Sequence, residues 1–206
     1  MKIRWNGHAC FTLTTNNGLI IVTDPFDKSV GYPCPDDRAD IVTVSHGHHD
    51  HNDTSSLRGD FKTLDQAGTF EMGDVRITAI SSYHDDVNGT KRGSNLLFKY
   101  ECDGLTIVHL GDLGHLPNAE QTAFLKNADI MMIPIGGFFT IDTKQALEVI
   151  RLVQPAHVIP MHYLTPVMNF PISDEKEFVR ATNAVYAHAR ELDASCLSFA
   201  TVFDYR

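Results

Sequence analysis

The segment from Ser45 to His51 concentrates four imidazoles and one carboxylate in seven residues, with the sequence Ser-His-Gly-His-His-Asp-His. The run before it, residues 39–44, is rich in β-branched side chains and predicts a buried strand. In open α/β sheets, functional groups gather on loops that leave the carboxyl ends of strands. Imidazoles and carboxylates are ligands of zinc, iron and manganese, so the segment predicts a metal site at a strand end.

Three more ligand-type residues follow predicted strands further along the chain. His84 comes after a strand expected at 75–80, Asp112 after one at 105–109, and His162 after one at 157–161. A single histidine or aspartate of this kind is more often a packed or turn residue. Their joint occurrence at strand ends favours one shared site.

Apolar periodicity predicts an α/β or α+β fold in a single domain that spans residues 1–206. Strands are expected at 2–5, 9–14, 19–23, 39–44, 75–80, 95–101, 105–109, 130–135, 157–161 and 197–203. Helices are expected near 54–58, near 118–127, from a cap at Asp142 to just before Pro155, and at about 174–192.

Charge and hydropathy exclude several classes of protein. A formal net charge of −9 argues against a nucleic-acid groove, which needs clustered Lys and Arg. No segment approaches the roughly 18 apolar residues that span a bilayer, and the first residues lack a signal-peptide pattern. Four widely spaced cysteines without a Cys-x-x-Cys pair are typical of free thiols in a reducing compartment. We therefore expect a cytoplasmic protein with no membrane or nucleic-acid partner.

His46, His48, Asp50 and His51 match the His-X-His-X-Asp-His signature of the metallo-β-lactamase superfamily, which the chain resembles over most of its length. Residues 39–52 and 134–140 resemble the short hydrolases similar to L-ascorbate-6-phosphate lactonase. The resemblance implies a four-layer αββα sandwich with the site at one edge. Nucleic-acid-processing members carry a large insertion between the bridging aspartate and the last histidine. Here only about 50 residues separate Asp112 from His162, which leaves no room for such a domain.

The resemblance also implies a set of metal ligands for two divalent ions, with zinc expected and manganese or iron as alternatives. The first ion would be held by His46, His48 and His84. The second would be held by Asp50, His51 and His162, with Asp112 bridging both. An aspartate in the position of Asp24 braces the metal-binding loop in the family, although Asp-Pro is also a common turn signal.

Two such ions can share a hydroxide that attacks an ester, a lactone or a phosphodiester-type bond of a small-molecule substrate. Asp112 and Asp50 are the expected catalytic residues, with Asp50 orienting the nucleophile and passing its proton to the leaving group. Residues expected to contact substrate are Gly136, Gly137, Thr140, Tyr163 and His115. Phe138 and Phe139 fit an apolar pocket wall or the core equally well.

Three further histidine and cysteine positions are interpreted structurally. His8 and Cys10 are expected to pack on a strand, and His49 is expected to face away from the metals. Two other functions stay open: a di-iron or mononuclear iron redox protein on the same fold, and a binding module that metals only stabilise. Assembly into a homo-oligomer is expected on general grounds.

Overall fold

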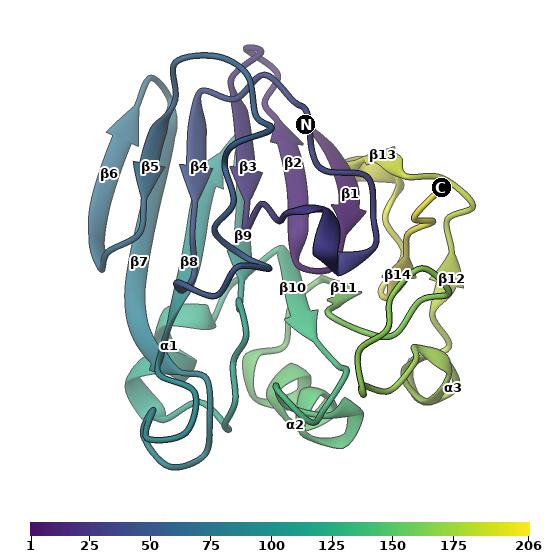
Figure 1. Ribbon diagram of the computed structural model, residues 1–206. Helices are drawn as coiled ribbons and strands as arrows, with labels where there is room; N and C mark the ends of the chain where they lie inside the picture. The colour runs from purple at the N-terminus through teal and green to yellow at the C-terminus, as the bar shows by residue number, and fades with distance from the viewer.

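The computed structural model describes all residues, 1–206, and contains two six-stranded mixed sheets (Figure 1). The first sheet, in the order β13-β1-β2-β3-β4-β5, consists of β1 (Lys2–Gly7), β2 (Cys10–Thr14), β3 (Ile20–Thr23), β4 (Ile41–Thr43), β5 (Lys62–Leu64) and β13 (Glu191–Asp193). The second, in the order β11-β10-β9-β8-β7-β6, consists of β6 (Gly68–Met72), β7 (Val75–Tyr83), β8 (Ser94–Cys102), β9 (Leu105–His109), β10 (Ile130–Pro134) and β11 (His157–Met161).

Alternation along the strands of the first sheet buries both of its faces. Phe11 and Ile21 point into the main core between the two sheets. Val22 and Val42, on the opposite face, join a second apolar cluster with Phe26 and other residues of the loops outside the sheet. The outer cover of this sheet is therefore made of loops, which contain one 3₁₀ turn at Lys28–Val30.

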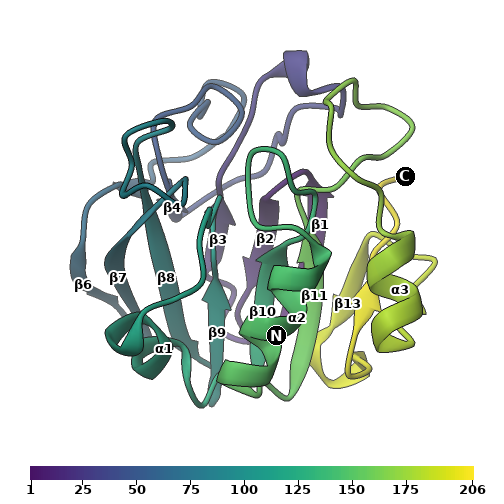
Figure 2. The same cartoon turned by 90° about the horizontal axis from the view of Figure 1, so that it is seen from below.

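The second sheet is covered by α1 (Ala119–Leu125) and α2 (Thr143–Val153), which lie on its outer side in Figure 2. Both helices begin with a capping box, and the second starts at the Asp142 cap that the sequence predicts. Asn118 and Gln121 close the first, and Asp142 and Gln145 close the second. The face of α2 that packs on the sheet consists of Ala146, Val149, Ile150 and Val153. The mixed α/β architecture with two facing sheets is thus confirmed.

Two predicted helices are wrong. No helix forms at 54–58: the Asp53 carboxylate accepts the Ser55 N–H as a cap would, but the chain continues as a turn. The helix expected at 174–192 is only α3 (Lys176–Thr182), which ends where Asn183 adopts a left-handed conformation with φ of 53°. The next residues form β12 (Val185–Tyr186), paired in parallel with β14 (Thr201–Val202), so tertiary pairing overrides the helical pattern.

The strand directions bring the site residues to one edge of the molecule. Strands β3 and β4 are parallel, and so are β9, β10 and β11, while β7 runs with β9 because each is antiparallel to β8. The loops after β3, β4, β7, β9 and β11 therefore meet at this edge. The longest helix, α2, is only 11 residues long, and none of the three is long and apolar enough to cross a membrane.

Candidate functional site

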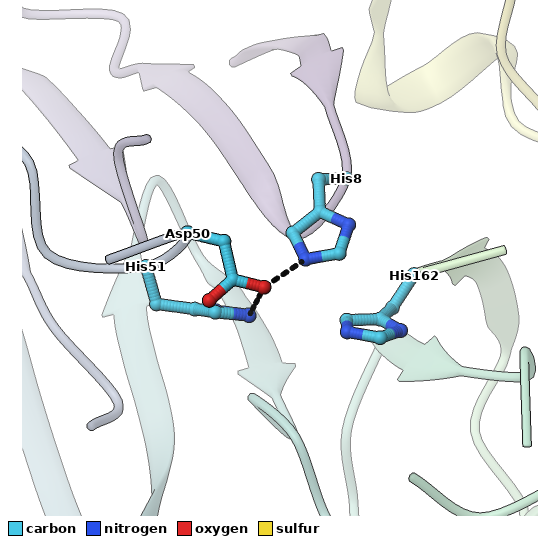
Figure 3. A group of neighbouring side chains, drawn as sticks. All are labelled: His8, Asp50, His51 and His162. Carbon is cyan, nitrogen blue, oxygen red and sulfur yellow. Dashed lines mark hydrogen bonds and ion pairs between the residues drawn. The ribbon is translucent and has the colours of Figure 1, made fainter. Parts of the chain in front are cut away.

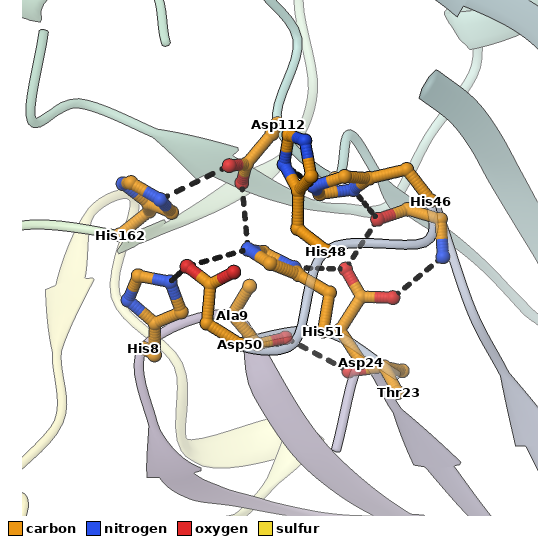
Figure 4. A network of polar contacts seen from close by, with 12 residues as sticks. His8, Ala9, Thr23, Asp24, His46, His48, Asp50, His51, Asp112 and His162 are labelled. Atoms are coloured by element: carbon orange, nitrogen blue, oxygen red, sulfur yellow. Dashed lines mark hydrogen bonds and ion pairs between the residues drawn. The ribbon is translucent and has the colours of Figure 1, made fainter. Parts of the chain in front are cut away.

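All seven residues expected to bind metal come together where these loops meet. Figure 4 labels six of them, all except His84. Their ligand atoms fall into overlapping groups in which every atom lies within 4.8 Å of the others. One group is His46, His48 and His84, which we call the first triad. Another contains Asp50, His51 and His162, which we call the second triad. These are the groupings that the sequence predicts, while the binding of metal by them stays a prediction.

The first triad turns its ring nitrogens toward one space. His46 Nε2 and His48 Nδ1 lie 3.0 Å apart, and the His46 and His84 rings are 4.7 Å apart between centroids. The outer nitrogens of two of these rings are anchored. His46 Nδ1 lies 2.9 Å from Ser45 Oγ, and His84 Nδ1 donates to the carbonyl of Phe139 at 3.1 Å. Such anchoring fixes the tautomer and the ring orientation.

His8 lies in the same group of ligand atoms as the second triad, and the sequence interpretation missed it (Figure 3). Its Nε2 lies 3.1 Å from Asp50 Oδ2, and its ring centroid is 4.1 Å from that of His162. The expectation that His8 packs on a strand is therefore corrected: it is buried, but it lies in a turn and belongs to the same group of possible metal ligands as Asp50, His51 and His162. It sits in the tight turn between β1 and β2, which turns its side chain toward the loop after β4.

Three residues of the site have a strained backbone. His8, Asp24 and His162 all have left-handed conformations, with φ of 53°, 41° and 50°. Such conformations are costly for residues other than glycine and persist where the surroundings hold them. The carbonyl of His8 accepts the Trp5 indole N–H and the His162 backbone N–H, both at 3.1 Å. The two turns are thereby fixed to each other.

Asp112 lies between the two triads. Its Oδ2 is 3.1 Å from His84 Nε2 and 3.1 Å from His162 Nε2, and its Oδ1 is 3.3 Å from His51 Nε2. Its backbone N–H donates to the Asn95 side chain at 2.9 Å, a support that no sequence signal indicated. The carboxylate therefore touches histidines of both triads.

Asp24 makes the bracing contacts expected of it. One carboxylate oxygen accepts the Ser45 N–H at 2.7 Å, and the other accepts the Ser45 hydroxyl at 2.6 Å and His51 Nδ1–H at 2.9 Å. It thereby fixes the start of the histidine segment and the orientation of the His51 ring.

Burial and charge act in opposite directions on these groups. Burial lowers the pKa of His8 and of His46 to about 3, so both rings are neutral near pH 7. Burial would also lower the pKa of His51, but the carboxylates of Asp112 and Asp24 raise it well above its usual value. For Asp112, burial opposes ionisation, yet the facing His162 and His51 rings hold its pKa well below the usual range.

The donors fit a metal centre on one further observation. His51 Nε2 and Asp112 Oδ1 are buried and have no hydrogen-bond partner, although they lie 3.3 Å apart. Buried polar atoms are seldom left unpaired, and a cation between them would satisfy both. Imidazole nitrogens and carboxylate oxygens are suitable ligands for zinc.

A cavity of about 400 Å³ opens over the two triads. Its walls consist of His48, His49, Asp50, His84, Lys91, Arg92, Asp112, Phe139, His162 and Phe170. His49 is exposed and stays outside the metal-ligand groups, as expected, although it forms part of the rim. Phe139 is a wall residue that also packs against the second apolar cluster, whereas Phe138 is 65% exposed.

None of the five residues expected to contact substrate lines this cavity, and their contact with substrate stays a prediction. Tyr163 is buried against Trp5, with ring centroids 5.3 Å apart. His115 accepts the Tyr83 N–H at 3.3 Å on the outer surface, and the Thr140 hydroxyl donates to its neighbour's carbonyl. Gly136 and Gly137 are buried behind the wall and do not line the cavity. Of the segment 136–140, Phe139 alone reaches the cavity.

Comparison with known proteins agrees with this geometry. The family profile of the beta-lactamase superfamily domain matches residues 2–162. A UPF0173 metal-dependent hydrolase from Thermoplasma acidophilum is 32% identical over 191 residues, which cover 80% of this chain and 84% of the relative. Another, from Methanosarcina mazei, is 31% identical over 214 residues, covering 89% and 91%.

Among solved structures, a Zn-dependent hydrolase of the metallo-β-lactamase superfamily from Thermotoga maritima is 33% identical, with a TM-score of 0.81. The match covers 98% of this chain and 97% of that one. None of these three proteins is named for a lactone, so the lactonase-like detail stays a prediction. The chain belongs to the metallo-β-lactamase superfamily and, within it, to the UPF0173 metal-dependent hydrolases.

Proposed function

We propose that this metal-dependent hydrolase uses two divalent ions, zinc by preference, to cleave an ester, lactone or phosphodiester-type bond in a small molecule. The observation that carries the proposal is the contact of Asp112 with histidines of both triads, at 3.1 to 3.3 Å. A carboxylate in this position can serve two ions at once, whereas two separate structural sites would not need to share it.

The residues that would hold the first ion are His46, His48 and His84, and those for the second are Asp50, His51 and His162. Asp112 would serve both. When bound, ions of this kind polarise a substrate oxygen and make a nucleophile available at neutral pH. Because the chain supplies several imidazoles and few carboxylates, the donor set favours zinc over magnesium or calcium.

Asp50 is the candidate for proton transfer. Both Asp50 and Asp112 line the cavity, but Asp50 is only partly buried, whereas Asp112 is buried. The Nε2 of His8 lies 3.1 Å from Asp50 Oδ2, and since His8 is neutral and buried, this contact holds the carboxylate in one orientation. The facing imidazoles of His8 and His51 keep the pKa of Asp50 below its usual range, although burial opposes this. An ionised, oriented carboxylate at the wall can take a proton from the nucleophile and give it to the leaving group.

The cavity supports a small-molecule substrate. Its volume of about 400 Å³ lies within the range of small-ligand sites. Phe139 and Phe170 supply apolar surface on one side, and the ring centroids of these residues are 6.2 Å apart. The substrate would bind between this surface and the triads.

Metal content and hydrolysis, measured on the same samples, test the proposal. Protein purified without added metal should contain about two zinc ions per chain by mass spectrometry. It should hydrolyse at least one member of a panel of phosphodiesters, lactones and esters. Asp112→Ala should lose metal and activity together, whereas Asp60→Ala, which removes an exposed carboxylate, should lose neither. Two irons with an optical absorption band would contradict the hydrolase proposal, as would bound metal without hydrolysis of any substrate.

A further inference from the structure

Two basic residues, Lys91 and Arg92, form one wall of the cavity above the triads. The chain has 17 Lys and Arg against 26 Asp and Glu, so cations are the minority. Lys91 is mostly exposed and pairs with Asp86 at 3.3 Å. Arg92 is partly buried and has no carboxylate within 4.0 Å. The two neighbours therefore differ in what their charges already contact.

The guanidinium of Arg92 is positioned without being neutralised. It lies 5.4 Å from the ring centroid of Phe139 and 5.9 Å from that of Phe138, over the faces of both rings. Its side chain donates no hydrogen bond within the protein. A guanidinium has five N–H donors in a planar fork that matches a carboxylate or a phosphate. The aromatic rings restrict its position while these donors stay free.

The backbone around Arg92 is fixed by a buried carboxylate. Asp85 accepts four backbone N–H groups, from Val87 and Gly89 on one oxygen and from Lys91 and Arg92 on the other, at 2.8 to 2.9 Å. Gly89 has φ of 80°, and a Cβ there would come within 2.9 Å of the Gly93 carbonyl oxygen. The turn that begins at His84 thus ends at Arg92 with little freedom. His84 of the first triad and the two basic residues of the wall therefore belong to the same loop.

The charge balance of the cavity favours the binding of an anion beside Lys91 and Arg92. Asp50 and Asp112 are the carboxylates on the cavity wall, and two divalent ions would more than neutralise them. With Lys91 and Arg92 above, the loaded cavity would be positive in a chain of net charge −9. Such a cavity attracts anions against the field of the rest of the molecule.

We propose that Arg92, assisted by Lys91, binds an anionic group of the substrate, a phosphate or a carboxylate that is separate from the bond being hydrolysed. The inference rests on the proposed hydrolase function and assigns a substrate class to it. A bidentate contact of the guanidinium with this group fixes the substrate between Phe139 and the triads. Arg92 is a binding residue in this account and takes no part in the chemical step.

A comparison of substrates that share a reactive bond tests the inference. The p-nitrophenyl esters of acetate, succinate and phosphonoacetate present a neutral, a carboxylate and a phosphonate group to the cavity. In Arg92→Gln, the kcat/KM for the preferred anionic ester relative to the acetate ester should fall at least tenfold, mainly through KM. Arg92→Lys should restore part of the ratio. Arg76→Gln, which removes an exposed arginine at the far end of β7, should leave the ratio unchanged. Metal content is measured for every variant, so that loss of metal is not mistaken for loss of anion binding.

The outcomes separate the inference from the function on which it rests. If the ratio of kcat/KM for the anionic ester to that for the acetate ester is equal in Arg92→Gln and Arg76→Gln, the anion site is overturned and the proposed hydrolase function still stands. If the wild type hydrolyses none of the esters, calorimetric titration of the metal-loaded proteins with inorganic phosphate and with succinate decides. Binding that weakens at least tenfold in Arg92→Gln supports the anion site, and binding that does not change overturns it.

Discussion

Two parts of the cavity are built in different ways. One is its floor, formed by the two triads, Asp112 and the residues that brace them, and the other is the basic wall of Lys91 and Arg92. In the floor, buried side chains hold one another: Asp24 fixes His51, Ser45 contacts His46, and Asp112 lies between the triads. In the wall, side chains are partly or fully exposed, and the backbone turn around Asp85 holds them. Changes in the floor should therefore affect metal binding and chemistry. Changes in the wall should affect the choice of substrate.

Within the floor, Asp50→Asn should have the largest effect on turnover. The amide keeps the shape of the side chain and can still accept a hydrogen bond from His8, but it cannot take up a proton. We expect kcat to fall roughly 10² to 10⁴-fold, the usual contribution of a positioned acid–base group, with at least half of the metal retained. Steady-state kinetics and metal analysis on one preparation measure both. If activity and metal fall in equal proportion, Asp50 has no separate role in proton transfer.

Asp24→Asn tests how far the floor depends on residues that would not touch metal. Asparagine tolerates the left-handed backbone of this position, so the change is confined to the carboxylate. An amide has only one oxygen, so either the Ser45 N–H, or the Ser45 hydroxyl together with His51 Nδ1–H, would face a nitrogen that cannot accept a hydrogen bond. We expect zinc affinity to fall about 10- to 100-fold in competition with a chelator. Asp60→Asn serves as the control, and a wild-type affinity in Asp24→Asn would show that the ring of His51 needs no brace.

The wall has its own test in Asp85→Asn. Two of the four backbone N–H groups would face an amide nitrogen in place of an oxygen acceptor, so the turn should loosen. We expect KM for anionic substrates to rise roughly threefold to tenfold, because the binding group is displaced and not removed. Asp60→Asn changes an exposed carboxylate outside this loop, and its KM should stay near that of the wild type. Equal KM values in the two variants would contradict the role of Asp85.

The smallest expected effect is on the pH dependence of stability, through the buried His109. His109 Nε2–H donates to the Ala9 carbonyl, and its Nδ1 accepts the Gly111 N–H, so the folded state needs the neutral ring. Burial lowers its pKa below the ordinary 6.5. Below about pH 6.5 the unfolded chain therefore binds a proton at His109 that the folded protein does not bind. The contribution of the neutral His109 ring to the free energy of unfolding is thus lost as the pH falls.

Denaturant unfolding of the metal-free wild type and of His109→Asn between pH 8 and 5 measures this contribution. The stability advantage of the wild type should be largest above pH 6.5 and should shrink below it, by at most about 1.4 kcal/mol per pH unit. An advantage that is constant across this range would mean that His109 is not neutral in the fold.

The same contrast explains how much of the site the sequence predicts. The floor is indicated by local patterns, since His46, His48, Asp50 and His51 lie together in the chain and the other ligands follow strands. His8 has no such pattern around it, and a turn between two other strands brings it to Asp50. Arg92 is one of 17 Lys and Arg residues, and nothing in the sequence sets it apart. Its guanidinium is free to bind an anion because no carboxylate lies within 4.0 Å of it in the fold.

The fold follows a similar division. Capping residues and buried periodicity predict α1 and α2 well, because those signals are local. The region after Thr182 has a helical pattern, yet Val185 and Tyr186 pair with Thr201 and Val202. Pairing between distant segments has no local signature, so this part required the structure.

The central claim is that two metal ions share Asp112. A crystal structure of the zinc-loaded protein, with anomalous maps recorded above and below the zinc edge, tests it most directly. Two anomalous peaks are expected, roughly 3.5–4 Å apart. One should lie against the first triad and one against the second, with Asp112 in contact with both. A single peak, or two peaks of which one does not touch Asp112, would contradict it.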